Sequence, residues 1–286
     1  MNKRGLTLIE LLIVLVISSI LIAGIYRTFI GQQHTYTVQE QVVDMQQSLR
    51  MAINQMVREI RMAGLGDLRP QDEDDKNDPK TLRWTGAGGM HGKYKNIVNP
   101  SDDGQSITVV GAFQEMTFIT VKPDSSGLKF QVDDASGFNT GGLQYLSING
   151  TESARVKNIV GKEIELFDPL TENHFVNEPV FRVMAITYSL GVFDGKPALL
   201  RNDNVTGDQP LAENIEFLQF TYTLEDGTVF VGTVPGGWKQ KVKIRMVQVT
   251  IRARTDRNDP ELGGGGDGFR RRTLTSNIQL RNLSSL

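Results

Sequence analysis

Residues 1–26 read MNKRGLTLIELLIVLVISSILIAGIY, where Lys3 and Arg4 precede an almost continuous apolar run. The 21 residues 6–26 are apolar or weakly polar, and Glu10 is the one charged residue among them. Arg27 follows directly after this run. As a helix this run spans about 31 Å at 1.5 Å per residue, close to the roughly 30 Å of a bilayer's hydrocarbon core. The sequence therefore predicts a membrane-spanning helix whose basic N-terminal end faces the cytoplasm.

A secretory signal peptide is the alternative interpretation of this segment. Such a signal has an apolar core of about 7–15 residues followed by a small-residue cleavage site. Here the apolar run is longer, and Ser18-Ser19 and Ala23-Gly24 are followed by more helix-compatible sequence. We therefore expect the segment to stay with the protein.

Glu10 is out of place in an apolar helix unless it has a role. An unpaired carboxylate in hydrocarbon costs on the order of a few kcal/mol, and ionisable residues in membrane helices mark functional sites. A plain membrane anchor with a chance glutamate is the alternative.

The junction at Gly5 resembles the N-terminal signal of type IV prepilins, which combines a basic leader, a glycine, a TLIE-type step and a long apolar helix. In that family a membrane peptidase cuts after the glycine and methylates the new N-terminal residue. The resemblance implies that 1–5 is a cleaved leader whose basic residues are Lys3 and Arg4. It implies cleavage between Gly5 and Leu6 and methylation of Leu6, where the family usually has phenylalanine. Glu10 matches the family's acid, which implies that it registers the subunit by pairing with the terminal amine of a neighbouring subunit.

The same resemblance implies a location and partners. The protein would sit in the inner membrane as a single-pass protein, with its N-terminus in the cytoplasm and its C-terminal domain in the periplasm, and later in a pilus or pseudopilus. Its partners would be the membrane, through residues 6–26, the prepilin peptidase, the inner-membrane assembly platform, and the major and other minor pilins.

Composition narrows the function classes. The chain has 286 residues and a net charge of −2, so no global charge attracts it to nucleic acid or anionic lipid. It contains no cysteine, which excludes a disulfide, a thiol nucleophile and a cysteine-bound metal.

The helical pattern continues beyond the membrane segment. We divide the predicted helix into a membrane and assembly half, 6–30, and an amphipathic half, 31–63. Apolar residues recur in the second half at steps of three and four, which predicts one stripe that packs on the globular part: Val38, Val42, Met45, Leu49, Ala52, Ile53, Met56 and Ile60. Gly64 and Gly66 are expected to end the helix.

Residues 64–100 form a predicted loop-rich excursion. Its acidic run Asp72–Asp78 could be a calcium site, because that ion binds several oxygen ligands. The EF-hand spacing is absent, so we favour a solvated acidic loop.

Residues 101–286 are predicted to be a β-rich globular domain, in one sheet or two. The short segments rich in branched and aromatic residues are SITVVGA, EMTFITVK, LKFQV, QYLSI, EIELF, VFRVMAITYSL, NIEFLQFTYTL, TVFVG, VKIRMVQVTIRAR and RRRTLTSNIQL. Many strands without intervening helices indicate antiparallel sheet. A break in the alternation at Val247 predicts a β-bulge there. The fold class is therefore α+β, a long N-terminal helix packed on antiparallel sheet, as in type IV pilins.

Blocks of the body resemble the PilW-like minor pilins, and the related minor pseudopilin J of type II secretion. They are NQMVREIRMAGLG, LAENIEFLQFTYTLEDG, VKIRMVQVTIRAR and SNIQLRNL. The resemblance implies a low-copy subunit that primes assembly or caps a fibre.

Enzymatic chemistry is not expected. His34, His91 and His174 lack metal-ligand spacing, so we predict no metal and no cofactor. Gly263, Gly265 and Gly268 satisfy a GxGxxG pattern without the strand before it and helix after it that a dinucleotide site needs, which predicts a hairpin loop.

Two charged groups complete the candidates. Glu163 and Glu165 lie on one face of a predicted strand and are expected to be solvated rather than catalytic. Arg270, Arg271 and Arg272 could bind DNA phosphates, but charges on a sheet edge also discourage strand addition. We therefore do not expect nucleic acid as a partner.

Overall fold

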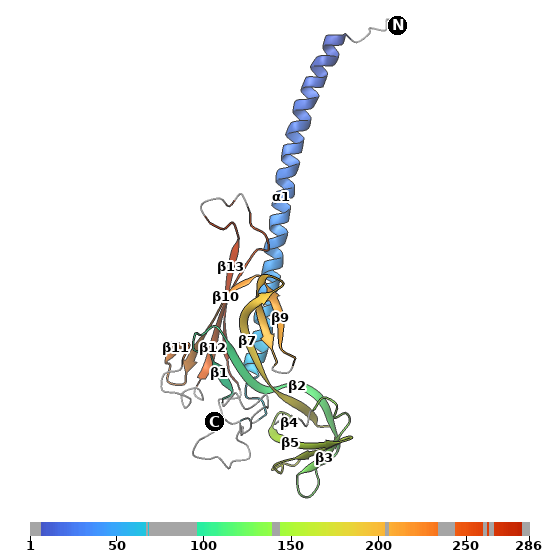
Figure 1. The fold of residues 1–286 in the computed structure, drawn as a ribbon, viewed down its shortest axis with the longest axis vertical. Helices are drawn as coiled ribbons and strands as arrows, with labels where there is room; N and C mark the ends of the chain where they lie inside the picture. The colour runs from blue at the N-terminus through green and yellow to red at the C-terminus, as the bar shows by residue number, and fades with distance from the viewer. Residues whose placement is uncertain are drawn as a thin grey trace. The chain divides into compact units, whose positions relative to one another are not determined.

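The computed structural model describes residues 7–66, 68, 96–138, 144–203, 206–233, 244–259, 262 and 266–281. Within these ranges one long helix is followed by antiparallel strands, which confirms the predicted α+β fold (Figure 1). The acidic run Asp72–Asp78 lies outside the described residues, so neither the predicted solvated loop nor the calcium alternative is tested.

The chain divides into two compact units. The first contains Met1–Gln47 and Thr255–Arg270, and the second contains Ser48–Arg254 and Arg271–Leu286. The boundary crosses the helix α1 (Leu8–Arg61, 54 residues), so α1 contributes to both units.

In the first unit, the loop 255–270 lies against α1. Asp259 is buried and accepts a hydrogen bond from Arg270 at 2.7 Å, and its other oxygen is 3.5 Å from the imidazole of His34. The backbone N–H of Arg257 donates to the side chain of Gln41 at 3.2 Å. Two points on α1 thus hold this loop.

The helix ends where the glycines predict. Gly64 and Gly66 have φ values of +81° and +108°, a region that glycine adopts without strain. Their backbone groups then join the sheet, because the N–H of Gly64 donates to Val110 O at 2.9 Å and that of Gly66 to Gly150 O at 3.1 Å.

The strands, all in the second unit, are β1 (Val98–Pro100), β2 (Ile107–Val121), β3 (Lys129–Val132), β4 (Gln144–Ile148), β5 (Glu152–Val160), β6 (Glu163–Leu166), β7 (Pro179–Phe193), β8 (Lys196–Asn202), β9 (Asp208–Glu213), β10 (Ile215–Leu224), β11 (Val229–Val231), β12 (Ile244–Arg254) and β13 (Arg271–Gln279). They form a nine-stranded sheet in the order β1-β2-β3-β6-β5-β4-β7-β8-β9, and a four-stranded sheet in the order β11-β10-β12-β13.

Part of the larger sheet closes into a barrel. β2 pairs with both β3 and β7, so the six strands β2-β3-β6-β5-β4-β7 make a complete ring. Its interior is apolar and is filled by Ile119, Phe130, Val132, Ala135, Phe138, Leu146, Ile148, Ala154, Val156, Ile164, Leu166 and Val180. The other halves of β2 and β7 pair as an open sheet beside α1, and in Figure 1 both strands run from that sheet into the barrel.

The structure corrects several strand predictions. β2 is one strand where two were expected, and two register shifts, at Ala112/Gln114 and Glu115/Thr117, account for its interrupted pattern. β1, β5, β8 and β9 were not predicted, because β1 is three residues at the end of the predicted loop and the other three mix polar and apolar residues. Only pairing with neighbours makes these segments strands. The bulge in β12 is not at Val247: pairing with β10 skips from Ile244 to Met246.

The second half of α1 packs on the open sheet as its stripe predicts. Leu49, Ala52, Met56 and Ile60 have no exposed surface. Burying a leucine, methionine or isoleucine side chain is worth about 1.5–3 kcal/mol, so Leu49, Met56 and Ile60 are the main apolar contribution of this stripe to the second unit.

Candidate functional site

Glu10 lies in the first turn of α1 and its side chain is exposed. Its carboxylate is 3.5 Å from the backbone N–H of Thr7, a long contact at the start of the helix. A carboxylate is favourable at this end because the helix dipole places partial positive charge there. The helix terminus therefore tolerates Glu10 but supplies no full counter-charge.

No lysine, arginine or histidine within the described ranges forms an ion pair with Glu10. Lys3, Arg4, Gly5 and Leu6 lie outside those ranges. In the part of the chain that the structure describes, the acid is therefore open to a cation from outside.

The apolar half of α1 is exposed along its whole length. Its large side chains each have about half or more of their surface accessible: Leu8, Ile9, Leu11, Leu12, Ile13, Val14, Leu15, Val16, Ile17, Ile20, Leu21, Ile22, Ile25, Tyr26, Phe29 and Ile30. By length and composition α1 is the one described helix that could cross a membrane, with an 18-residue window of mean hydropathy 2.8 that is not buried inside the protein. A helix that is apolar on all sides needs a lipid or protein environment.

The segment that contains the glycine-rich run lies between two paired strands, which agrees with the predicted hairpin loop. It connects the antiparallel strands β12 and β13, and the N–H of Asp259 donates to Gly268 O at 2.8 Å. Gly263 and Gly265 lie outside the described residues.

The basic trio is partly neutralised. Arg270 pairs with Asp259 at 2.7 Å, Arg271 pairs with Glu216 at 2.6 Å, and Arg272 is exposed on β13, the last strand of the four-stranded sheet. The position of Arg272 on an edge strand agrees with the interpretation that these charges discourage the addition of another strand.

Glu163 and Glu165 both lie on β6 and are partly exposed. Glu163 forms an ion pair with Lys129 at 3.4 Å, and Glu165 forms one with Lys157 at 2.6 Å.

Sequence reasoning missed Glu59, a buried acid on the apolar stripe of α1. Its carboxylate accepts a hydrogen bond from Tyr188 of β7 and pairs with Arg201 of β8 at 3.0 Å. Burial and the negative charge of Glu59 raise the pKa of the Tyr188 hydroxyl, which stays protonated and donates. The available signal was position, because Glu59 follows Met56 by three residues on the buried face. The group ties α1 to two strands of the open sheet.

Sequence reasoning also missed a cluster of polar side chains on the barrel. Glu152 begins β5, and the segment between β6 and β7 brings Glu172, His174 and Glu178 to it. The separation of more than twenty residues between Glu152 and His174 left no local signal.

Comparison with known families gives one match. Residues 1–26 match the prokaryotic N-terminal methylation motif. The motif indicates a prepilin of the type IV pilin or pseudopilin kind, which is a structural rather than an enzymatic class. It suggests processing by a prepilin peptidase and assembly with other pilins, and the apolar helix fits membrane insertion. Comparisons of the chain with curated proteins and with solved structures find no match.

Proposed function

We propose that this protein is a minor type IV pilin, a structural subunit that helps to prime a pilus or to cap it. The peptidase cuts between Gly5 and Leu6 and methylates Leu6. Residues 6–26 then hold the subunit in the inner membrane, with its N-terminus in the cytoplasm and its β-rich domain in the periplasm. The assembly platform extracts it into a fibre with major and minor pilins.

The observation that carries the proposal is the combination, in one helix, of a matched methylation motif with an exposed apolar half. An ordinary membrane anchor needs only apolar residues. The carboxylate of Glu10 is exposed near the N-terminal end of the apolar run. There it can pair with the terminal amine of a neighbouring subunit. Such a pair favours one register over others, which is the best-supported role of buried charges.

The resemblance of the body to PilW-like minor pilins supports a low-copy position. The blocks that carry it are NQMVREIRMAGLG, LAENIEFLQFTYTLEDG, VKIRMVQVTIRAR and SNIQLRNL. Subunits of that kind prime a fibre or cap it.

A minor pseudopilin of a type II secretion system is the second candidate. The motif at 1–26 is shared by both classes, and the body resembles blocks of both. Deleting the gene separates them: loss of surface pili with secretion intact supports the pilin, and loss of secretion with pili intact supports the pseudopilin.

Processing tests the common part of the proposal. In cells with a prepilin peptidase, mass spectrometry of the mature protein should find a chain that begins with methylated Leu6. Gly5→Leu should leave most of the chain uncut, whereas Gly5→Ala should be cut to a much larger extent, because the peptidase site accepts only a small residue. A fibre subunit that still begins with Met1 would contradict the proposal.

A further inference from the structure

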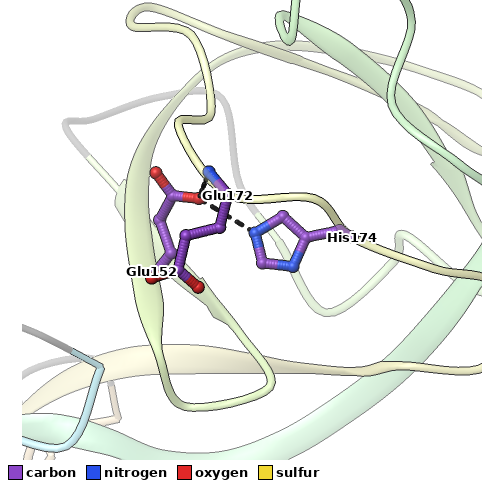
Figure 2. Close-up of side chains that lie close together, drawn as sticks. All are labelled: Glu152, Glu172 and His174. Carbon is purple, nitrogen blue, oxygen red and sulfur yellow. Dashed lines mark hydrogen bonds and ion pairs between the residues drawn. The ribbon is translucent and has the colours of Figure 1, made fainter.

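Glu152 and His174 form a buried polar pair on the outside of the barrel's apolar core. Their side chains are 6% and 2% exposed, and the carboxylate oxygen Oε2 of Glu152 lies 2.9 Å from Nε2 of His174. The other ring nitrogen, Nδ1, lies 2.8 Å from a carboxylate oxygen of Glu178. Figure 2 shows Glu152, Glu172 and His174 close together, with the exposed Glu172 beside the buried pair.

The surroundings keep Glu152 ionised. Burial alone would raise its pKa, but hydrogen bonds from His174, from the backbone and hydroxyl of Thr171 and from the backbone of Glu172 outweigh burial and lower the pKa to about 2. Three of these donors occupy lone pairs on the two oxygens at 2.7–3.0 Å. The remaining lone pair points at Nε2 of His174. A metal ion bound to both atoms would replace the hydrogen bond that joins them at 2.9 Å.

The charge of the cluster is unbalanced. Three carboxylates, those of Glu152, Glu172 and Glu178, surround a single imidazole, and no lysine or arginine among the described residues pairs with any of them. With a protonated imidazole the cluster carries three negative charges and one positive charge. A divalent cation with a neutral imidazole leaves one net negative charge instead of two, and excess charge is costly beside the buried carboxylate of Glu152.

We propose that Glu152, Glu172 and His174 bind a divalent metal ion of the zinc type. One imidazole nitrogen with carboxylate oxygens is a ligand set that zinc accepts and that calcium, which takes oxygen ligands, does not favour. The 2.9 Å between Nε2 and Oε2 suits two ligands that each bond a metal at about 2.1 Å and subtend about a right angle. The candidate ligand atoms of all three residues lie within 4.8 Å of one another.

The remaining residues have clear roles in this site. Glu178 accepts a hydrogen bond from Nδ1, which leaves Nε2 as the metal ligand, and such outer carboxylates are common behind metal-bound histidines. Glu172 is exposed and its side chain contacts the hydroxyl of Thr151 at 3.2 Å, so it can turn toward the ion at little cost. Water completes the coordination on this open side. The ion would join the start of β5 to the segment that leads into β7.

Zinc titration of the full chain in detergent micelles, after treatment with a chelator, tests the site. At pH 7.5 calorimetry should give one zinc per chain. Titrations in two buffers of different ionisation enthalpy should show release of about one proton, because metal ligands must be deprotonated. His174→Gln should weaken binding about 100-fold or more, and Glu172→Gln and Glu178→Gln about tenfold or more. Calcium in place of zinc should give no comparable heat.

The controls separate this site from adventitious binding. His34→Gln and His91→Gln remove the other two histidines, and Glu163→Gln removes an exposed carboxylate of the same barrel; all three should bind zinc as the wild type does. If His174→Gln fails to fold, Glu172→Gln decides, since the exposed Glu172 side chain makes one hydroxyl contact. Absence of saturable zinc binding, or binding that Glu172→Gln and Glu178→Gln leave unchanged, would overturn the proposal and assign the cluster to a protonated histidine between two carboxylates.

Discussion

The two halves of α1 contain the same kinds of apolar side chain in different surroundings. From Leu8 to Ile30 these side chains lie on every side of the helix and are exposed. From Met45 to Ile60 most of them lie on one side and are buried or half-buried, and Met51 is the exposed exception. The surroundings that each half requires are set by how its apolar residues are distributed around the helix axis.

The acids of the two halves show the same difference. Glu10 is exposed and has no ion-pair partner among the described residues, whereas Glu59 is buried and bonded to Tyr188 and Arg201. A carboxylate whose partners are in the same chain contributes to folding. One that has no such partner among the described residues is open to a cation from outside.

The largest effect is expected at Glu10, and it concerns assembly rather than folding. Glu10→Ala and Glu10→Gln should both insert into the membrane and be processed, since they remove a charge that costs a few kcal/mol in hydrocarbon. Surface fibres should fall about tenfold or more, because the priming subunit loses a charge-assisted hydrogen bond to its neighbour, worth roughly 1.5–3 kcal/mol. Fibres are counted after shearing, and processed subunit in the inner membrane is measured by immunoblot. Wild-type assembly by both variants would show that Glu10 does not register this subunit.

The next effect is expected at Glu59, and it concerns folding. Glu59→Ala should reduce the free energy of unfolding of the second unit by about 3–5 kcal/mol, because it leaves Arg201 without its buried partner. Urea unfolding of the full chain in detergent, followed by near-ultraviolet circular dichroism, measures this change. Glu40→Ala, an exposed glutamate of the same helix, is the matched control and should change little. Equal effects of the two substitutions would show that the buried pair contributes no more than a surface charge.

A pair of leucines gives the smallest and most direct comparison. Leu49→Ala should reduce the free energy of unfolding by about 2–5 kcal/mol, because it leaves a cavity in the core. Leu21→Ala, in the exposed half, should change it by no more than about 0.5 kcal/mol under the same detergent conditions. Similar losses at both positions would mean that the first half of α1 also supports the folded domain.

Much of this architecture could be predicted from the sequence because its signals are local. The apolar run 6–26 and the stripe that ends at Ile60 follow from helical periodicity, and the end of α1 follows from Gly64 and Gly66. Most strands were found for the same reason, since their branched and aromatic residues favour extended backbone. The methylation motif is also contiguous, so its processing junction and Glu10 could be proposed without any structure.

Only the tertiary structure decided how these parts combine. The barrel closes because β2 pairs with β7, and no local pattern specifies a partner strand so far along the chain. The hydrogen-bond partners of Glu59 in the sheet are 129 and 142 residues away. Likewise, His174 meets Glu152 across 22 residues. A buried charge is stable only where distant groups satisfy it, so its sequence position alone could not show that Glu59 belongs to the core or that Glu152 and His174 form a site.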